Sequence, residues 1–345
     1  MTHDRSNLIT EYVRTHPASS STEIFEGTGR IAAYATIGRD LAKLVSNGVL
    51  SVTGKGKASR YSLSPVYELS QPVDLDVYFS REIDQRQIHD GYNFSLIETL
   101  ASVPLFTEAE SQRLAAQQAL FADNISKLTS AGYRKEMERL GVDLSWKSSQ
   151  IEGNTYSLLE TERLLLEKET AAGKSKEEAV MLLNHKEALD FILDNPDYLS
   201  ELTMAKIETI HSILVKELDV DCNIRTRRVG ITGTNYRPLD NEFQIREALE
   251  QTCRLVNGRS SVFERALLIL LLLSYIQPFN DGNKRTARIV SNASLIAEGY
   301  CPLSFRTVDS IDYKKAMLLF YEQNNISAFK QIFIEQFIFA VKTYF

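Results

Sequence analysis

A polar cluster at residues 277–288 holds the side chains of this chain that are best suited to chemistry. Its charged members are Asp281, Lys284, Arg285 and Arg288. Arg285 and Arg288 are three residues apart, so on a helix they share a face and can grip neighbouring phosphates with their forked N–H donors. Asp281 supplies carboxylate oxygens, which Mg²⁺ prefers as ligands. We therefore predict a site for a phosphorylated ligand and its metal ion.

Two helices must position this cluster. The apolar pattern over 261–276 predicts a buried helix, which Pro278 ends because proline lacks an amide proton and restricts the residue before it. A second helix is predicted over 283–298. Its first amides have no partners within the helix and lie at the positive end of the helix dipole, which favours bound anions. Gly282 lets the backbone approach such a ligand closely.

The cluster resembles the Fic motif, His-Pro-Phe-x-x-Gly-Asn-Gly-Arg-x-x-Arg. Residues that match it as they stand are Pro278, Phe279, Gly282, Asn283, Arg285 and Arg288, and Asp281 matches a commonly acidic position. The resemblance implies transfer of AMP from ATP, with Mg²⁺, to a Tyr, Ser or Thr hydroxyl of a target protein, which can be the chain itself. The implied catalytic positions are Gln277, Asp281 (also the metal ligand), Asn283 and Arg285; the implied nucleotide-binding positions are Gly282, Asn283, Lys284, Arg285 and Arg288.

The chain departs from the motif at two positions. Gln277 stands where the family has the histidine that accepts the hydroxyl proton, and an amide can orient a hydroxyl but cannot take its proton. Since a general base typically contributes about 10²–10⁴-fold, we expect weak transfer with nucleotide binding retained. Lys284 replaces a glycine, which leaves phosphate transfer open as an alternative. The retained arginine pair favours AMP.

A second segment, Ser-Ser-Gln-Ile-Glu-Gly-Asn at 148–154, resembles the family's inhibitory helix, with Ser148, Glu152 and Gly153 in register. We place that helix at residues 145–154. The resemblance implies that Glu152 pairs with Arg288 and occupies the place of the ATP γ-phosphate. A tethered carboxylate competes with a free phosphate for one guanidinium at an entropic advantage.

Residues 228–238 contain β-branched side chains around a central Gly-Thr-Asn, a pattern that predicts a β-hairpin between helices. The segment resembles the family's flap, which would hold an extended stretch of the target protein through main-chain hydrogen bonds. The predicted flap residues are Ile231, Thr232, Gly233, Thr234, Asn235 and Tyr236.

Residues 1–64 differ from the rest of the chain in charge, with eight Lys or Arg against five Asp or Glu, whereas the whole chain has a net charge of −6. Their pattern predicts three short helices and two strands and resembles a winged helix-turn-helix. The basic residues expected on its third helix and wing are Arg39, Lys43, Lys55, Lys57 and Arg60. Such a module can bind DNA or dock a protein, including a second copy of the chain, and both readings stay open.

The expected fold is mainly α: a Fic-type helical bundle with a β-hairpin flap, plus a small α+β winged-helix domain. We expect domains at 1–64 and 90–345 joined by a linker at 65–89. The longest apolar run, 266–276, is too short to span a bilayer, and the N-terminus lacks a signal-peptide pattern. Three widely spaced cysteines fit a reduced, cytoplasmic protein.

Two further functions remain as alternatives. One is a catalytically degenerate Fic protein that acts as a nucleotide-binding or DNA-binding regulator. The other is removal of AMP from a modified protein, which Gln277 disfavours because that route also tends to use the histidine, as an acid.

Overall fold

The computed structural model describes residues 2–89 and 91–345, whose contacts form two compact units that meet in sequence between Pro72 and Val73. Met1 and Asp90, the first residues of the expected domains, lie outside the described residues. The segment expected to be a linker is divided between the units. Helix α4 (Pro65–Ser70) belongs to the first, while α5 (Leu75–Phe79) and the 3₁₀ turn η2 (Ile83–Gln85) belong to the second.

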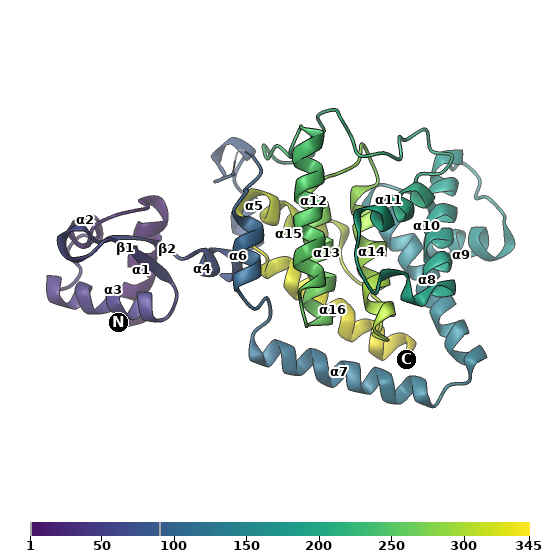
Figure 1. The fold of residues 1–345 in the computed structure, drawn as a ribbon, viewed down its shortest axis with the longest axis horizontal. Helices are drawn as coiled ribbons and strands as arrows, with labels where there is room; N and C mark the ends of the chain where they lie inside the picture. Colours follow the sequence, from purple (N-terminus) through teal and green to yellow (C-terminus); the bar gives the residue numbers. More distant parts are fainter. Residues whose placement is uncertain (1, 90) are drawn as a thin grey trace. The chain divides into compact units, whose positions relative to one another are not determined.

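The first unit contains the three helices and two strands that its sequence predicts (Figure 1). Its strands pair antiparallel, with Leu50 opposite Leu63, and Ser19 adds a bridge to Tyr61. Apolar side chains from all five elements form one core, which includes Ile37 from the predicted stripe. These five elements are α1 (Thr2–Thr15), α2 (Ser21–Gly27), α3 (Tyr34–Ser46), β1 (Leu50–Thr53) and β2 (Arg60–Leu63), and the 3₁₀ turn η1 (Gly56–Ala58) lies between the two strands.

The second unit is helical, as expected for a mainly α fold, and among the described residues the chain's only sheet is the β1–β2 pair. None of the described helices has the length and apolarity needed to cross a bilayer. Besides α5 and η2, the unit contains α6 (Leu96–Ser102), α7 (Glu108–Ser126), α8 (Ser130–Ile151), α9 (Leu158–Glu167), α10 (Lys176–Asp194), η3 (Pro196–Leu199), α11 (Met204–Leu214), α12 (Glu242–Asn257), α13 (Val262–Ile276), α14 (Asn283–Ala297), α15 (Ser310–Gln323) and α16 (Ser327–Tyr344).

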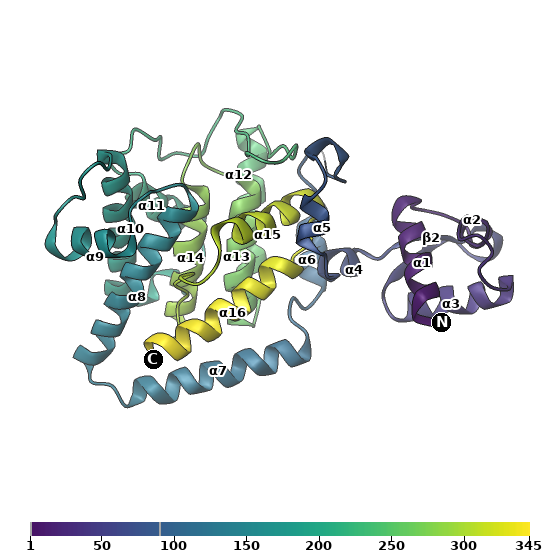
Figure 2. The same cartoon turned by 180° about the vertical axis from the view of Figure 1, so that it is seen from behind.

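The helices α13 and α14 form the centre of this unit and lie side by side in both views (Figures 1 and 2). Nearly every side chain of α13 is buried, because this helix is apolar on all faces and packs against α12, α14 and α15. Helix α14 also contacts α8, α10 and α11. The turn between α13 and α14 carries the polar cluster, so the most buried helix pair of the fold positions the candidate site.

The prediction of a hairpin at 228–238 is wrong, because no residue of that segment pairs with another in a strand ladder. Its polar groups bind partners elsewhere in the unit: Gly233 O accepts a hydrogen bond from Arg86 Nη2 at 2.7 Å, and the Tyr236 hydroxyl donates to Tyr275 O at 3.1 Å. A parallel bridge joins Arg237 to Gly91. Tertiary hydrogen bonds thus replace the cross-strand bonds that the β-branched pattern predicted.

Candidate active site

The turn after α13 begins at Gln277, which caps the helix in the left-handed conformation with φ of 51°. Its backbone N–H donates to Leu273 O at 3.1 Å, a common way to satisfy a carbonyl at a helix end. Its side-chain amide nitrogen donates to Ser274 O at 2.7 Å, so this amide folds back onto the last turn of α13. Gln277 nevertheless lines the cleft described below.

Arg225 holds the same turn in place, and nothing in the sequence pattern had indicated it. The residue is 1% exposed, and its guanidinium donates to Gln277 O at 2.6 Å and to Ile276 O at 3.4 Å. It also donates to the carbonyls of Arg227 and Leu239. The charge therefore lies at the C-terminal end of α13, where the helix dipole favours a cation, and it ties this turn to both ends of the 228–238 loop.

The next residues of the turn are fixed by reciprocal contacts. Asn283 Oδ1 accepts from Phe279 N and Asn283 Nδ2 donates to Phe279 O, both at 2.8 Å. The Phe279 ring stacks on His211 with centroids 3.6 Å apart. Gly282 has φ of 77°, and a Cβ there would lie 3.2 Å from His211 Cε1. The asparagine thus acts on the turn itself, and the glycine is needed for both its dihedral angle and its packing.

The start of α14 carries buried donors that have no partner among the described residues. Its N-cap, Gly282, supplies no side-chain acceptor for the first amides. Arg285 and Arg288 are 2% and 0% exposed, and among the described residues Arg285 Nε and Nη1 and Arg288 Nη1 have no hydrogen-bond partner. Buried donors without partners are costly, so these groups are suited to bind an anionic ligand. Burial lowers the pKa of Arg285, opposed by the charge of Asp281.

Glu152 follows the last residue of α8 and lies against this cluster. Its Oε1 accepts from Arg288 Nη2 at 2.9 Å, and its Oε2 lies 3.3 Å from Lys284 Nζ. Arg288 also donates to Ser148 Oγ at 2.8 Å and to Ser148 O at 2.9 Å. The structure thus brings together Ser148, Glu152 and Arg288, and it adds Lys284 as a second cation on the same carboxylate.

These cations control the protonation of Glu152. Burial alone would raise the pKa of its carboxyl group, but the charges of Arg288 and Lys284 and the hydrogen bond from Arg288 outweigh burial and lower the pKa to about 2. A depressed carboxyl pKa contributes stability that is present above the usual carboxyl pKa and is lost as the pH falls toward the depressed value. The ion pair is consequently complete at neutral pH.

This contribution can be measured against pH. We expect the difference in unfolding free energy between the protein and Glu152→Gln to stay constant from pH 7 to about 5. It should shrink by up to about 3 kcal/mol as the pH falls through 4.5 toward 2, since each pKa unit corresponds to about 1.4 kcal/mol. Urea unfolding at pH 7, 5, 4 and 3 measures it. The exposed Glu167 on α9 gives a control, Glu167→Gln, for which we expect no such change; parallel curves for both variants would contradict the prediction.

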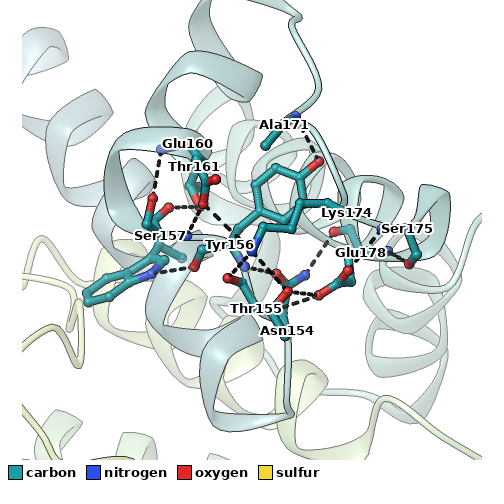
Figure 3. Close-up of polar contacts among 11 residues, drawn as sticks. Asn154, Thr155, Tyr156, Ser157, Glu160, Thr161, Ala171, Lys174, Ser175 and Glu178 are labelled. Atoms are coloured by element: carbon teal, nitrogen blue, oxygen red, sulfur yellow. Dashed lines mark hydrogen bonds and ion pairs between the residues drawn. The ribbon is translucent and has the colours of Figure 1, made fainter.

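The chain just after Glu152 is anchored to the start of α10 (Figure 3). Glu178 Oε1 accepts from Thr155 N and from Thr155 Oγ1, both at 2.7 Å, and Glu178 O accepts from Asn154 Nδ2 at 2.9 Å. Lys174 Nζ donates to Thr155 O at 2.6 Å. The hydrogen bonds from Thr155 and Ser175 lower the pKa of Glu178 to about 2. Glu152 is thus fixed from both sides, by α8 before it and by this anchor after it.

The end of α8, the 228–238 loop and the turn between α13 and α14 line a cleft of about 350 Å³, a size typical of small-ligand sites. Of the six predicted flap residues, Ile231 and Thr232 line it, whereas Gly233, Asn235 and Tyr236 contact other parts of the unit. Helix α15 also lines the cleft, which the sequence had not indicated. The lining residues include Glu152, Gln277, Asp281, Gly282, Asn283, Lys284, Tyr313, Met317, Leu318 and Tyr321.

Asp281 is suited to share a metal ion with a ligand. Its side chain is 67% exposed at the cleft and lies 3.3 Å from Arg285 Nη2. Within the described part of the chain, no three His, Cys, Asp or Glu side chains are grouped to hold a metal. A metal here would take its remaining ligands from phosphate oxygens and water, and Mg²⁺ is commonly held in this way.

Comparison with known proteins agrees with this geometry. A sequence profile described as the Fic/DOC family matches residues 201–295, which contain the 228–238 loop, α13 and most of α14. The fold resembles that of Caenorhabditis elegans Fic-1, with a TM-score of 0.60 at 21% identity over 72% of this chain and 80% of the solved one. A Bacteroides thetaiotaomicron signalling protein with a Fic domain has a TM-score of 0.55 at 19% identity, covering 67% and 95%. Residues 201–295 thus match the Fic/DOC family, and the fold of the chain is similar to that of these solved proteins.

Curated relatives of this chain are named protein adenylyltransferases. That of C. elegans, fic-1, is 26% identical over 222 residues, which are 62% of this chain and 43% of the relative. That of Nematostella vectensis is 30% identical over 172 residues, 49% of this chain and 40% of the relative. The chain therefore matches less than half the length of these relatives.

Proposed function

We propose that this chain transfers AMP from ATP to hydroxyl side chains of a target protein. The observation that carries the proposal is a set of three buried guanidinium donors at the start of α14, where no side chain caps the helix. Arg285 Nε, Arg285 Nη1 and Arg288 Nη1 have no hydrogen-bond partner among the residues that the structure describes. These donors suit a polyphosphate, and relatives with matching segments are named adenylyltransferases. Arg285 and Arg288 would bind the phosphates with the first amides of α14.

Residues that line the cleft have separate parts in this reaction. Asp281 would hold Mg²⁺, which neutralises phosphate charge when bound. Ile231 and Thr232 would lie along the target segment, whose hydroxyl reaches Gln277. Gln277 cannot accept the hydroxyl proton, and its amide nitrogen is already engaged by Ser274 O. Transfer by the protein as it stands is therefore expected to be weak.

Glu152 supports a regulated form of this activity. Its carboxylate is held by Arg288 and Lys284, two cations that an ATP phosphate would otherwise contact. A charged group tethered at this position competes directly with the nucleotide. We therefore infer that the protein is autoinhibited and that ATP binds fully only when Glu152 leaves.

Incubation with Mg²⁺ and ATP labelled at the α-phosphate tests the proposed activity. Label on the protein, appearing faster in Glu152→Gly than in the parent, is the expected result. Equal rates of transfer in the parent and in Glu152→Gly would show that Glu152 does not inhibit the protein. If no label appears even after Gln277→His is added, the proposed activity is refuted.

A second proposal concerns DNA and is favoured by the surface of the first unit. Arg39 and Lys43 are exposed on α3, and Lys55, Lys57 and Arg60 are exposed on or beside the β1–β2 hairpin. A helix and an adjacent hairpin with exposed cations can contact DNA phosphates together.

Binding to duplex DNA should weaken steeply with salt if these five cations contact phosphates. Each neutralised phosphate contributes a slope of about −0.9 in log K against log salt concentration, so Lys55→Gln with Lys57→Gln should make the slope less negative by about 2. Fluorescence anisotropy of the full chain on a labelled duplex measures it. Arg30→Gln, at an exposed arginine already paired with Glu26, is the control. Absence of binding at 50 mM salt would oppose the DNA proposal.

A further inference from the structure

The loop 228–238, which forms one wall of the cleft, takes its shape from a segment far away in sequence. We call residues 76–89 the strap. Arg86 Nη2 of the strap donates to Gly233 O at 2.7 Å, and Asn235 Nδ2 donates to Asp84 Oδ1 at 2.9 Å. Because no residue of the loop pairs with another in a ladder, these contacts do for the loop what cross-strand bonds do for a hairpin.

The strap is itself anchored on Glu322 of α15. Arg86 Nη1 lies 3.2 Å from Glu322 Oε1, and the two side chains are 3% and 0% exposed. The Tyr78 hydroxyl donates to Glu322 Oε2 at 2.7 Å, and His89 N donates to Glu322 O at 2.8 Å. A buried ion pair with added hydrogen bonds has few alternative geometries, so the Arg86 guanidinium is held in one place.

We propose that Arg86 is a positioning residue for the acceptor side of the cleft. Its guanidinium uses one nitrogen to bind Glu322 on α15, which also lines the cleft through Met317 and Leu318. It uses the other nitrogen to bind Gly233, one residue after Thr232. Arg86 thereby sets the distance between the two walls that a target segment must enter. The inference rests on the proposed function for its catalytic consequence, but its structural consequence can be tested alone.

Limited trypsin digestion tests the structural part, because the exposed Arg228 lies at the start of the loop. Arg86→Lys keeps a charge opposite Glu322 but lacks the fork that reaches two partners. We expect cleavage after Arg228, mapped by mass spectrometry, to be about 10-fold to 100-fold faster in this variant, because cleavage follows the population of the opened loop. Asp84→Ala, an exposed change that leaves the buried pair intact, should give a smaller increase at the same bond.

Lys315→Gln is the matched control. It removes the ion pair between Lys315 of α15 and Asp76 of the strap, which lies outside the loop contacts. Its cleavage after Arg228 should equal that of the parent. The proposal is overturned if Arg86→Lys and Asp84→Ala are also cleaved at the parent rate. It is equally overturned if cleavage rises to the same extent at every site of the second unit, which would mean general destabilisation.

The catalytic part is tested with the Gln277→His and Glu152→Gly substitutions present. Adding Arg86→Lys should lower AMP incorporation about 10-fold to 100-fold, as expected for a misplaced acceptor, while calorimetry shows ATP affinity within a factor of two. A parallel fall in ATP affinity would contradict a role confined to the acceptor side. If the starting double variant transfers no AMP, the proposed function fails, and the digestion result still decides whether Arg86 holds the loop.

Discussion

Gln277→His, introduced together with Glu152→Gly, should raise the rate of AMP transfer about 10²–10⁴-fold over Glu152→Gly alone. A histidine has a ring nitrogen that can accept the hydroxyl proton near neutral pH, whereas the amide of Gln277 has none, and general bases contribute on this scale. The surrounding turn should tolerate the change, because the contacts from Arg225 and Leu273 at this position involve the backbone of residue 277. Initial rates with ATP labelled at the α-phosphate give the comparison.

The pH dependence of the transfer rate shows whether the increase caused by Gln277→His comes from a general base. Transfer by Gln277→His should rise with pH as the new imidazole loses its proton, and transfer by Gln277→Asn should stay at the level of the parent side chain. A histidine variant no faster than the asparagine variant would show that the missing base does not limit this protein.

Glu152→Gly should raise the affinity for ATP by about 10-fold to 100-fold. If the glutamate pairs with Arg288 in most molecules, the apparent affinity is reduced by the small fraction in which the site is open, and removing the competitor recovers that factor. Arg288 should remain in place after the substitution, since it still donates to Ser148 Oγ and Ser148 O. Isothermal titration calorimetry with ATP and Mg²⁺ measures the dissociation constants of the parent and of Glu152→Gly.

Glu152→Gln separates charge from size in this experiment. It keeps the shape of the side chain and removes the charge that Arg288 and Lys284 bind. The affinity of Glu152→Gln for ATP should lie between the affinities of the parent and of Glu152→Gly. Equal affinities in all three proteins would mean that Glu152 does not compete with the nucleotide.

Local signals in the sequence were sufficient to predict the helix ends that carry the proposed phosphate-binding residues. Pro278 and Gly282 mark the turn, and the apolar run before them predicts the buried α13. The Glu152–Arg288 pair joins residues 136 positions apart, so no local pattern could predict it. It was expected only from the resemblance to the family.

The structure differs where long-range hydrogen bonds outweigh local propensity. The β-branched residues of 228–238 favour strands, but Arg86 and Tyr275 bind this segment from outside and hold it as a loop. No pattern in the sequence indicated the structural role of Arg225 either. An arginine in a polar stretch is usually exposed, and only the fold shows that its guanidinium is buried among the carbonyls at the end of α13.

The position of the label in ATP distinguishes transfer of AMP from transfer of the γ-phosphate. The protein with Gln277→His and Glu152→Gly is incubated with Mg²⁺ and either α-labelled or γ-labelled ATP, and the label on the protein is counted. We predict label from the α-phosphate and none from the γ-phosphate, as AMP transfer requires. Label from the γ-phosphate alone, or no label from either, would contradict the claim that this cleft is an adenylyltransferase site closed by Glu152.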